Sequence, residues 1–169
     1  MSEAIERLQI RDRLKLETRH FEGEDKLYVA FDSEDIDALT GELKFESIRF
    51  PDFSCNWSRF SEPADLRIRP WGQPDDGCYS IRVSTARYKQ IATPVHDPIQ
   101  TQNYENYAHV EVRELLPGES IYFEPPRGRK SKNKTRKNLR MEYRQNIVNN
   151  RMTELDVGES ASPLSEIER

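Results

Sequence analysis

Apolar and polar residues alternate in several short stretches of the chain, a pattern that is typical of β-strands with one buried face. The period of two is clearest over residues 26–31, 78–83 and 107–113. In the last stretch, the residues expected to face the core are Ala108, Val110 and Val112. We therefore predict three strands, and we expect the second face of residues 107–113, which carries His109, to point outward.

The other elements of the body follow weaker patterns. Residues 45–50 and 121–123 are predicted as two further short strands. Residues 13–20 can pair with residues 26–31 in a hairpin or form an N-terminal helix, and the pattern favours neither. The rest is assigned to short helices within 34–39 and 85–90 and to loops at 51–60 and 95–98.

Helical periodicity appears only near the C-terminus, where we predict a helix over residues 135–150. An apolar stripe recurs every four residues and consists of Leu139, Tyr143 and Ile147. A basic stripe lies beside it and consists of Arg136, Arg140 and Arg144. The helix is therefore expected to dock its apolar stripe on the body and present arginines next to it.

Together these elements favour an α+β fold, with a small, mainly antiparallel sheet and a C-terminal basic amphipathic helix. The length of 169 residues suits one domain, and the hydrophobic share of 35% predicts a modest core with polar segments outside it. We assign residues 1–126 to an α+β core domain, 127–151 to a basic loop and helix, and 152–169 to an acidic disordered tail.

Charge is strongly segregated along the chain. Residues 1–126 carry a net charge of −9, residues 127–151 carry +9, and residues 152–169 carry −4, which together give the overall −4. A basic block of this density releases counterions when it binds a phosphate backbone. The predicted nucleic-acid-binding residues are Arg127, Arg129, Lys130, Lys132, Lys134, Arg136, Lys137, Arg140 and Arg144.

Two other interpretations of the basic block remain open. It can dock on an acidic protein partner, or it can lie against the acidic body of its own chain. The sequence pI of about 5.5 counts against a protein dedicated to nucleic acid.

A pair of histidines offers a different chemistry. His96 and His109 can act as general base and general acid in phosphodiester cleavage, since imidazoles titrate near neutral pH. In this alternative, Glu111 orients His109 and Arg113 stabilises the developing negative charge. The competing interpretation is that both histidines are structural.

Residues 50–60 are rich in aromatic side chains. Trp57 and Phe60 are predicted to contact a protein partner in an adaptor role, or else to fill one end of the core. Cysteine and histidine are zinc ligands, but Cys55 and Cys78 form no Cys-x-x-Cys pair and the histidines no His-x-x-x-His pair. No metal and no cofactor are therefore predicted.

Several classes of protein are excluded by simple features. The longest apolar run, Leu27–Phe31, is far shorter than the roughly 20 residues of a membrane helix. The N-terminus is mixed in charge and lacks the apolar stretch of a secretory signal. Two cysteines do not make a disulfide framework. We expect a cytoplasmic protein without a membrane partner.

Some of these stretches also resemble a set of small uncharacterised bacterial proteins. The resemblance covers about residues 26–115 and is carried by Leu27–Phe31, Phe53–Trp57, Val95–Pro98 and Asn106–Val112. It implies a bacterial cytoplasmic protein and no particular activity. The sequence thus predicts a non-enzymatic binding module that contacts nucleic acid or an acidic partner, with a phosphodiester-cleaving toxin or defence effector and a protein–protein adaptor as alternatives.

Overall fold

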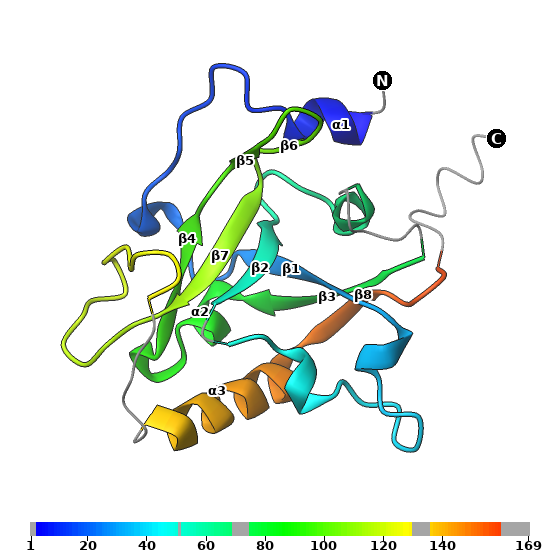
Figure 1. The fold of residues 1–169 in the computed structure, drawn as a ribbon, viewed down its shortest axis with the longest axis vertical. Coiled ribbons are helices and arrows are strands. Elements are labelled where there is room, and N and C mark those ends of the chain that lie inside the picture. The colour runs from blue at the N-terminus through cyan, green and yellow to red at the C-terminus, as the bar shows by residue number, and fades with distance from the viewer. Residues whose placement is uncertain (1–2, 51, 69–74, 130–135, 160–169) are drawn as a thin grey trace.

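The computed structural model describes residues 3–50, 52–68, 75–129 and 136–159. Six strands form one fully antiparallel sheet in the order β4-β7-β2-β1-β3-β8 (Figure 1). Their bounds are β1 Lys26–Phe31, β2 Asp52–Trp57, β3 Gly77–Arg82, β4 Ala92–His96, β7 His109–Glu114 and β8 Met152–Leu155. Two shorter strands, β5 Ile99–Gln100 and β6 Glu105–Asn106, pair separately.

Among these described residues, three α-helices accompany the sheet: α1 Glu3–Leu8, α2 Val83–Ala86 and α3 Lys137–Asn150. Short 3-10 turns lie at Thr18–His20, Ser33–Asp35, Phe45–Ser47, Pro63–Arg67 and Tyr88–Gln90. Figure 1 shows α3 as the main helix of the molecule, next to the Phe45–Ser47 turn, and α1 beside the β5–β6 hairpin. The predicted α+β fold, with its mainly antiparallel sheet and C-terminal helix, is confirmed.

The main core lies between one face of the sheet and α3. Leu27 of β1 is paired with Trp57 of β2 and Ile81 of β3, so these three side chains share that face. Tyr143 and Ile147 of α3 are fully buried against it, and the Tyr143 hydroxyl donates to the Ala86 carbonyl oxygen at 2.7 Å. Leu139, the third member of the predicted apolar stripe, lies in the first turn of α3 and is 37% exposed, so it does not belong to the core.

The opposite face of the sheet carries a smaller apolar cluster. Leu66 of the Pro63–Arg67 turn packs on Cys78 of β3 and Leu155 of β8. On the same face, β7 carries the side chains of His109, Glu111 and Arg113, and all three are buried. The prediction that this row points outward is wrong, because the chain beyond β4 and the segment near Pro125 cover it.

Three segments differ from their predicted local structure. Residues 45–50 form a turn, because the carbonyls of Ile48 and Phe50 bond to Arg144 of α3 instead of a neighbouring strand. Residues 121–123 also form a turn, with the Ile121 carbonyl bonded to the Thr93 hydroxyl. Residues 13–17 form no strand and residues 18–20 form a 3-10 turn, so the hairpin over 13–20 is not found, and the N-terminal α-helix lies earlier, at Glu3–Leu8.

Two predicted loops are strands. β2 lies at the centre of the sheet, and its apolar residues alternate with Ser54 and Asn56. Asn56 is buried and its side-chain amide is bonded to Ser61 and Asn106, so this part of the polar row of the strand is covered as well. β4 forms one edge of the sheet and buries all five of its residues, including the predicted loop residue His96.

The predicted acidic tail begins too early. Residues 152–155 form β8, which pairs with β3 and completes the sheet. Glu154 of this strand accepts hydrogen bonds from Lys26 and Ser80, both at 2.8 Å, which links the strand to β1 and β3. Residues 160–169 of the predicted tail and residues 130–135 of the predicted basic loop lie outside the described residues.

Candidate functional site

His96 is built into the core. Its side chain is fully buried among the rings of Trp57, Phe60 and Tyr107. Nδ1 accepts a hydrogen bond from the Leu16 backbone N–H at 2.8 Å, and Nε2 donates to the Tyr107 carbonyl at 2.6 Å. Burial lowers the pKa of His96 to about 4, so the imidazole is neutral at physiological pH. With both nitrogens bonded, His96 has no free position for proton transfer.

His109 lies on the other face of the sheet from His96. His96 is paired with Val110 and shares its face, so the preceding residue of β7 must point the opposite way. His109 Nδ1 donates to the Asp97 carbonyl at 2.7 Å, and burial lowers the pKa of its imidazole. The structure therefore does not bring together the two histidines of the predicted phosphodiester-cleaving site.

The other two residues of that predicted site bond to each other. Arg113 Nε donates to Glu111 at 2.7 Å, and its two Nη groups reach the Pro125 carbonyl at 2.9 Å and Asp97 at 3.5 Å. Arg127 approaches Glu111 from the segment that follows, at 3.5 Å. Every donating nitrogen of Arg113 is engaged within the protein, which matches a structural role for this ion-pair cluster.

The aromatic residues predicted to meet a protein partner belong to the core. Trp57 is fully buried, stacks on Phe21 with ring centroids 3.9 Å apart, and donates its indole N–H to Asp25 at 3.0 Å. Phe60 is half-buried and packs edge-on against the Trp57 and Tyr107 rings. The prediction that Trp57 forms a docking surface is wrong, because β2 turns this side chain inward.

The arginines of the basic block face the body of the protein. Arg129 bonds to Glu119 at 2.6 Å and to the Glu114 carbonyl at 2.9 Å. Arg136 donates to the Leu115 carbonyl at 2.7 Å, and Arg140 forms two bonds of 2.8 Å with the Glu114 carboxylate. These residues, predicted to bind nucleic acid, instead support the alternative in which the block lies against its own acidic body.

Glu114 is the centre of this arrangement. Its side chain is buried at the end of β7 and faces the guanidinium groups of Arg136 and Arg140. Burial by itself raises the pKa of this carboxyl, but the hydrogen bonds and charges of the two arginines outweigh it and hold the pKa below its usual value. Glu114 therefore stays ionised and holds α3 on the sheet.

The lysines of the block are placed differently from the arginines. Lys137 begins α3, is exposed, and makes no ion pair within the described part of the chain. Lys130, Lys132 and Lys134 lie outside the described residues. Arg144, at the other end of the basic stripe, donates hydrogen bonds from its guanidinium to the carbonyls of Ile48 and Phe50, both at 3.0 Å.

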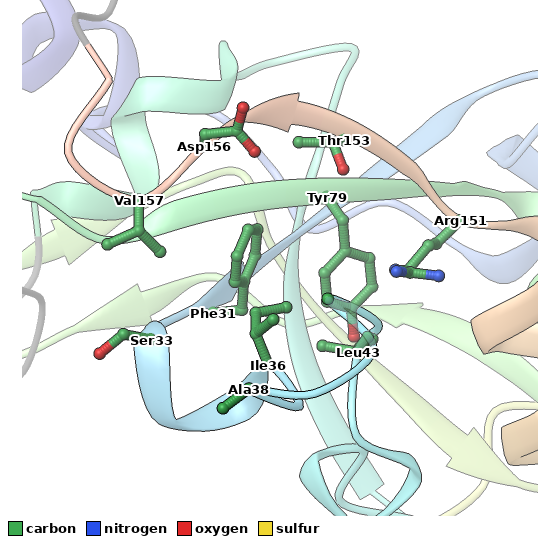
Figure 2. Close-up of a pocket in the computed structure, with 11 residues that line it drawn as sticks. Phe31, Ser33, Ile36, Ala38, Leu43, Tyr79, Arg151, Thr153, Asp156 and Val157 are labelled. Carbon is green, nitrogen blue, oxygen red and sulfur yellow. The ribbon is translucent and has the colours of Figure 1, made fainter.

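A cavity of about 440 Å³ opens beside Arg151, the residue that follows α3 (Figure 2). It lies between the chain that follows β1 and the strands β3 and β8, and its wall is mainly apolar. The lining side chains that form this wall are Phe31, Ile36, Leu43, Tyr79 and Val157. Sequence reasoning missed this site because its residues come from three separate segments with no motif in common.

One charged group stands at each side of the cavity. Figure 2 shows the Arg151 guanidinium extending toward the Tyr79 ring, and Asp156 at the other side. Arg151 donates from one Nη to the Val148 carbonyl at 2.7 Å and makes no ion pair among residues that the structure describes. Burial raises the pKa of Tyr79, so its hydroxyl stays protonated and can donate a hydrogen bond.

Metal chemistry finds no support in the described part of the chain. None of its groups of three or more histidine, cysteine or acidic side chains has the geometry to hold a metal ion. Cys55 and Cys78 are buried and form no disulfide, and burial raises the pKa of the Cys55 thiol. Within the same residues, no helix is long and apolar enough to span a membrane.

Comparison with known proteins leaves the geometry as the only guide to function. No protein-family model, curated protein sequence or solved structure matches this chain. The choice between the predicted functions therefore depends on which charged and apolar groups the fold leaves available for a ligand.

Proposed function

We propose that the protein is a non-enzymatic binding module that contacts nucleic acid through the lysines of its basic block. These are Lys130, Lys132, Lys134 and Lys137. The arginines of the block other than Arg127 bond to the body of the protein, so the proposal assigns them an anchoring role instead of a direct contact. The same proposal includes a cytoplasmic location, supported by two buried cysteines that form no disulfide.

The observation that carries this proposal is the convergence of both ends of residues 130–135 on one residue of the sheet. On one side, Arg129 bonds to the backbone carbonyl of Glu114. On the other side, Arg136 and Arg140 bond to the carboxylate of the same Glu114. Arg129 and Arg136, on either side of the lysines in the sequence, are therefore already fixed and lose no further freedom when a ligand binds, which favours affinity.

Charge supports a polyanion as the ligand. The body of the protein carries −9 and repels a nucleic acid, so attraction is confined to the basic block. Lysines bind phosphate as point charges and read no base sequence, so we expect little preference among sequences. A duplex and a single strand both satisfy this requirement.

The test is the binding of a fluorescent 20-nucleotide duplex and single strand, followed by anisotropy at several salt concentrations. Changing the four lysines to Gln should weaken binding about tenfold or more at 0.1 M salt, and should flatten a log–log salt slope of about −0.9 per phosphate contacted. The matched control changes four exposed cations of the body to Gln, namely Lys15, Arg19, Lys44 and Arg49. It should bind like the parent.

Two results would count against the proposal. Absence of salt-dependent binding by the intact chain would remove it. Binding of poly-glutamate in place of both nucleic acids would replace nucleic acid with an acidic protein as the partner.

A further inference from the structure

We propose that the cavity in Figure 2 is a binding site for a small aromatic carboxylate. The ring of the ligand would lie against the apolar wall, and its carboxylate would pair with Arg151. This site is separate from the lysines of the basic block, and its ligand is a small molecule instead of a polymer.

The size and lining of the cavity suit such a ligand. A volume of about 440 Å³ lies within the range of small-molecule sites, which are mostly apolar with a few polar groups that set orientation. Phe31 and Tyr79 form one wall with ring centroids 6.1 Å apart and planes inclined by 38°. A flat ring can pack on these two faces while Ile36 and Leu43 close the other side.

The wall is preformed by close packing behind it. Phe31 lies directly over Gly77 of β3, where an added Cβ atom would come within 2.5 Å of the Phe31 ring. The ring therefore cannot move back toward the strand and stays at the border of the cavity. A site that does not have to rearrange binds its ligand with a smaller entropic cost.

The charge pattern selects an anion at one end only. Arg151 is half-buried, follows directly after α3, and has only its Nη1 bonded to Val148. Its remaining N–H groups and the Tyr79 hydroxyl can donate to a carboxylate placed between them. Asp156 at the other side of the cavity repels a second negative charge, so a monocarboxylate is favoured over a dicarboxylate.

The experiment is calorimetric titration of the full chain with 2-naphthoate and with its uncharged counterpart, 2-naphthamide. We expect saturable binding of 2-naphthoate that weakens about tenfold in Arg151→Gln. Binding of 2-naphthamide should be weaker and should not respond to this change. Arg49→Gln removes an exposed charge outside the cavity and should leave both affinities as they are.

A second pair of variants tests the location. Ala38 lines the cavity, whereas Leu39 next to it is 96% exposed and does not. Ala38→Trp should fill the mouth of the cavity and abolish 2-naphthoate binding, and Leu39→Trp should preserve it. The proposal is overturned if the parent shows no saturable binding up to millimolar 2-naphthoate, if Ala38→Trp binds normally, or if Arg151→Gln weakens both probes equally.

Discussion

His96 shows how a titratable residue becomes a structural one. Its two ring nitrogens join the backbone of Leu16 to that of Tyr107, two segments far apart in the chain. Only the neutral ring can accept from one partner and donate to the other, so the fold depends on the uncharged form. Acid should therefore lower the stability of the folded protein, because His96 takes up a proton more readily in the unfolded chain than in the folded one.

The residue-scale prediction concerns stability against pH. His96 has a folded pKa of about 4 against 6.5 when unfolded, so the unfolded chain binds more protons between these values. The free energy of unfolding should fall as pH drops from 6.5 to 4, by up to about 3 kcal/mol from this residue. Urea titrations at a series of pH values measure the slope, and His96→Gln should reduce it.

A matched control separates titration from packing. Val95→Ala, in the same strand, should lower stability at every pH and keep the slope of the parent. If His96→Gln is too unstable for urea titration, the imidazole nitrogen shifts of the parent report the pKa of His96 directly. A value near 6.5 would refute the burial argument.

At the scale of the element, α3 depends on its surroundings. Its first turn carries Lys137 and no acidic residue, and the N-cap residue Arg136 provides no side-chain cap, so positive charge adds to the positive end of the helix dipole. An isolated helix of this kind is a weak one. Within the protein, contacts with the sheet compensate for the low intrinsic stability of the helix. They are the burial of Tyr143 and Ile147 and the bonds of two arginines to Glu114.

We predict that Glu114→Gln destabilises the protein by about 3 kcal/mol, since it leaves the buried Arg136 and the half-buried Arg140 without a counter-charge. Urea denaturation measures the change. Glu142→Gln makes the same substitution on the exposed side of α3, where the carboxylate meets Lys89, and should leave the free energy of unfolding nearly unchanged. Equal losses from the two variants would show that Glu114 does not anchor the helix.

At the scale of the whole molecule, the sheet brings a strand near the C-terminal end of the described chain next to strands from its first half. β8 comes last in sequence and pairs with β3, and Glu154 reaches β1 through Lys26. Leu155 packs with Cys78 and Leu66 in the second apolar cluster. Residues 152–155 therefore belong to the same packed unit as the strands near the N-terminus, and we expect them to unfold together.

Leu155→Ala tests whether β8 unfolds together with the rest of the sheet. The change should cost about 2 to 3 kcal/mol, as expected for a buried leucine, whereas Met152→Ala at an exposed position of the same strand should cost less than about 0.5 kcal/mol. The urea midpoint of Leu155→Ala should be lowered by the same amount whether unfolding is followed by tryptophan fluorescence or by far-UV circular dichroism. Transitions that separate would mean that β8 unfolds independently of the sheet.

Short-range patterns were sufficient for part of this fold. The alternation in residues 26–31, 78–83 and 107–113 and the four-residue repeat in α3 predict β1, β3, β7 and the C-terminal helix, because each depends on neighbouring residues alone. The α+β class follows from these elements. The segregation of charge is likewise a property of the sequence, whatever the fold.

Tertiary structure alone decided which groups remain available for function. The edge strand β8 is stabilised by partners more than seventy residues away, so no local signal marks it. The alternation of β2 is present in the sequence, but only the fold shows that its polar residue Asn56 is buried. The same applies to the arginines that turn toward Glu114, to the histidines on opposite faces of the sheet, and to the cavity at Arg151. Each results from contacts between distant segments, whose free energy depends on the complete packing of the chain.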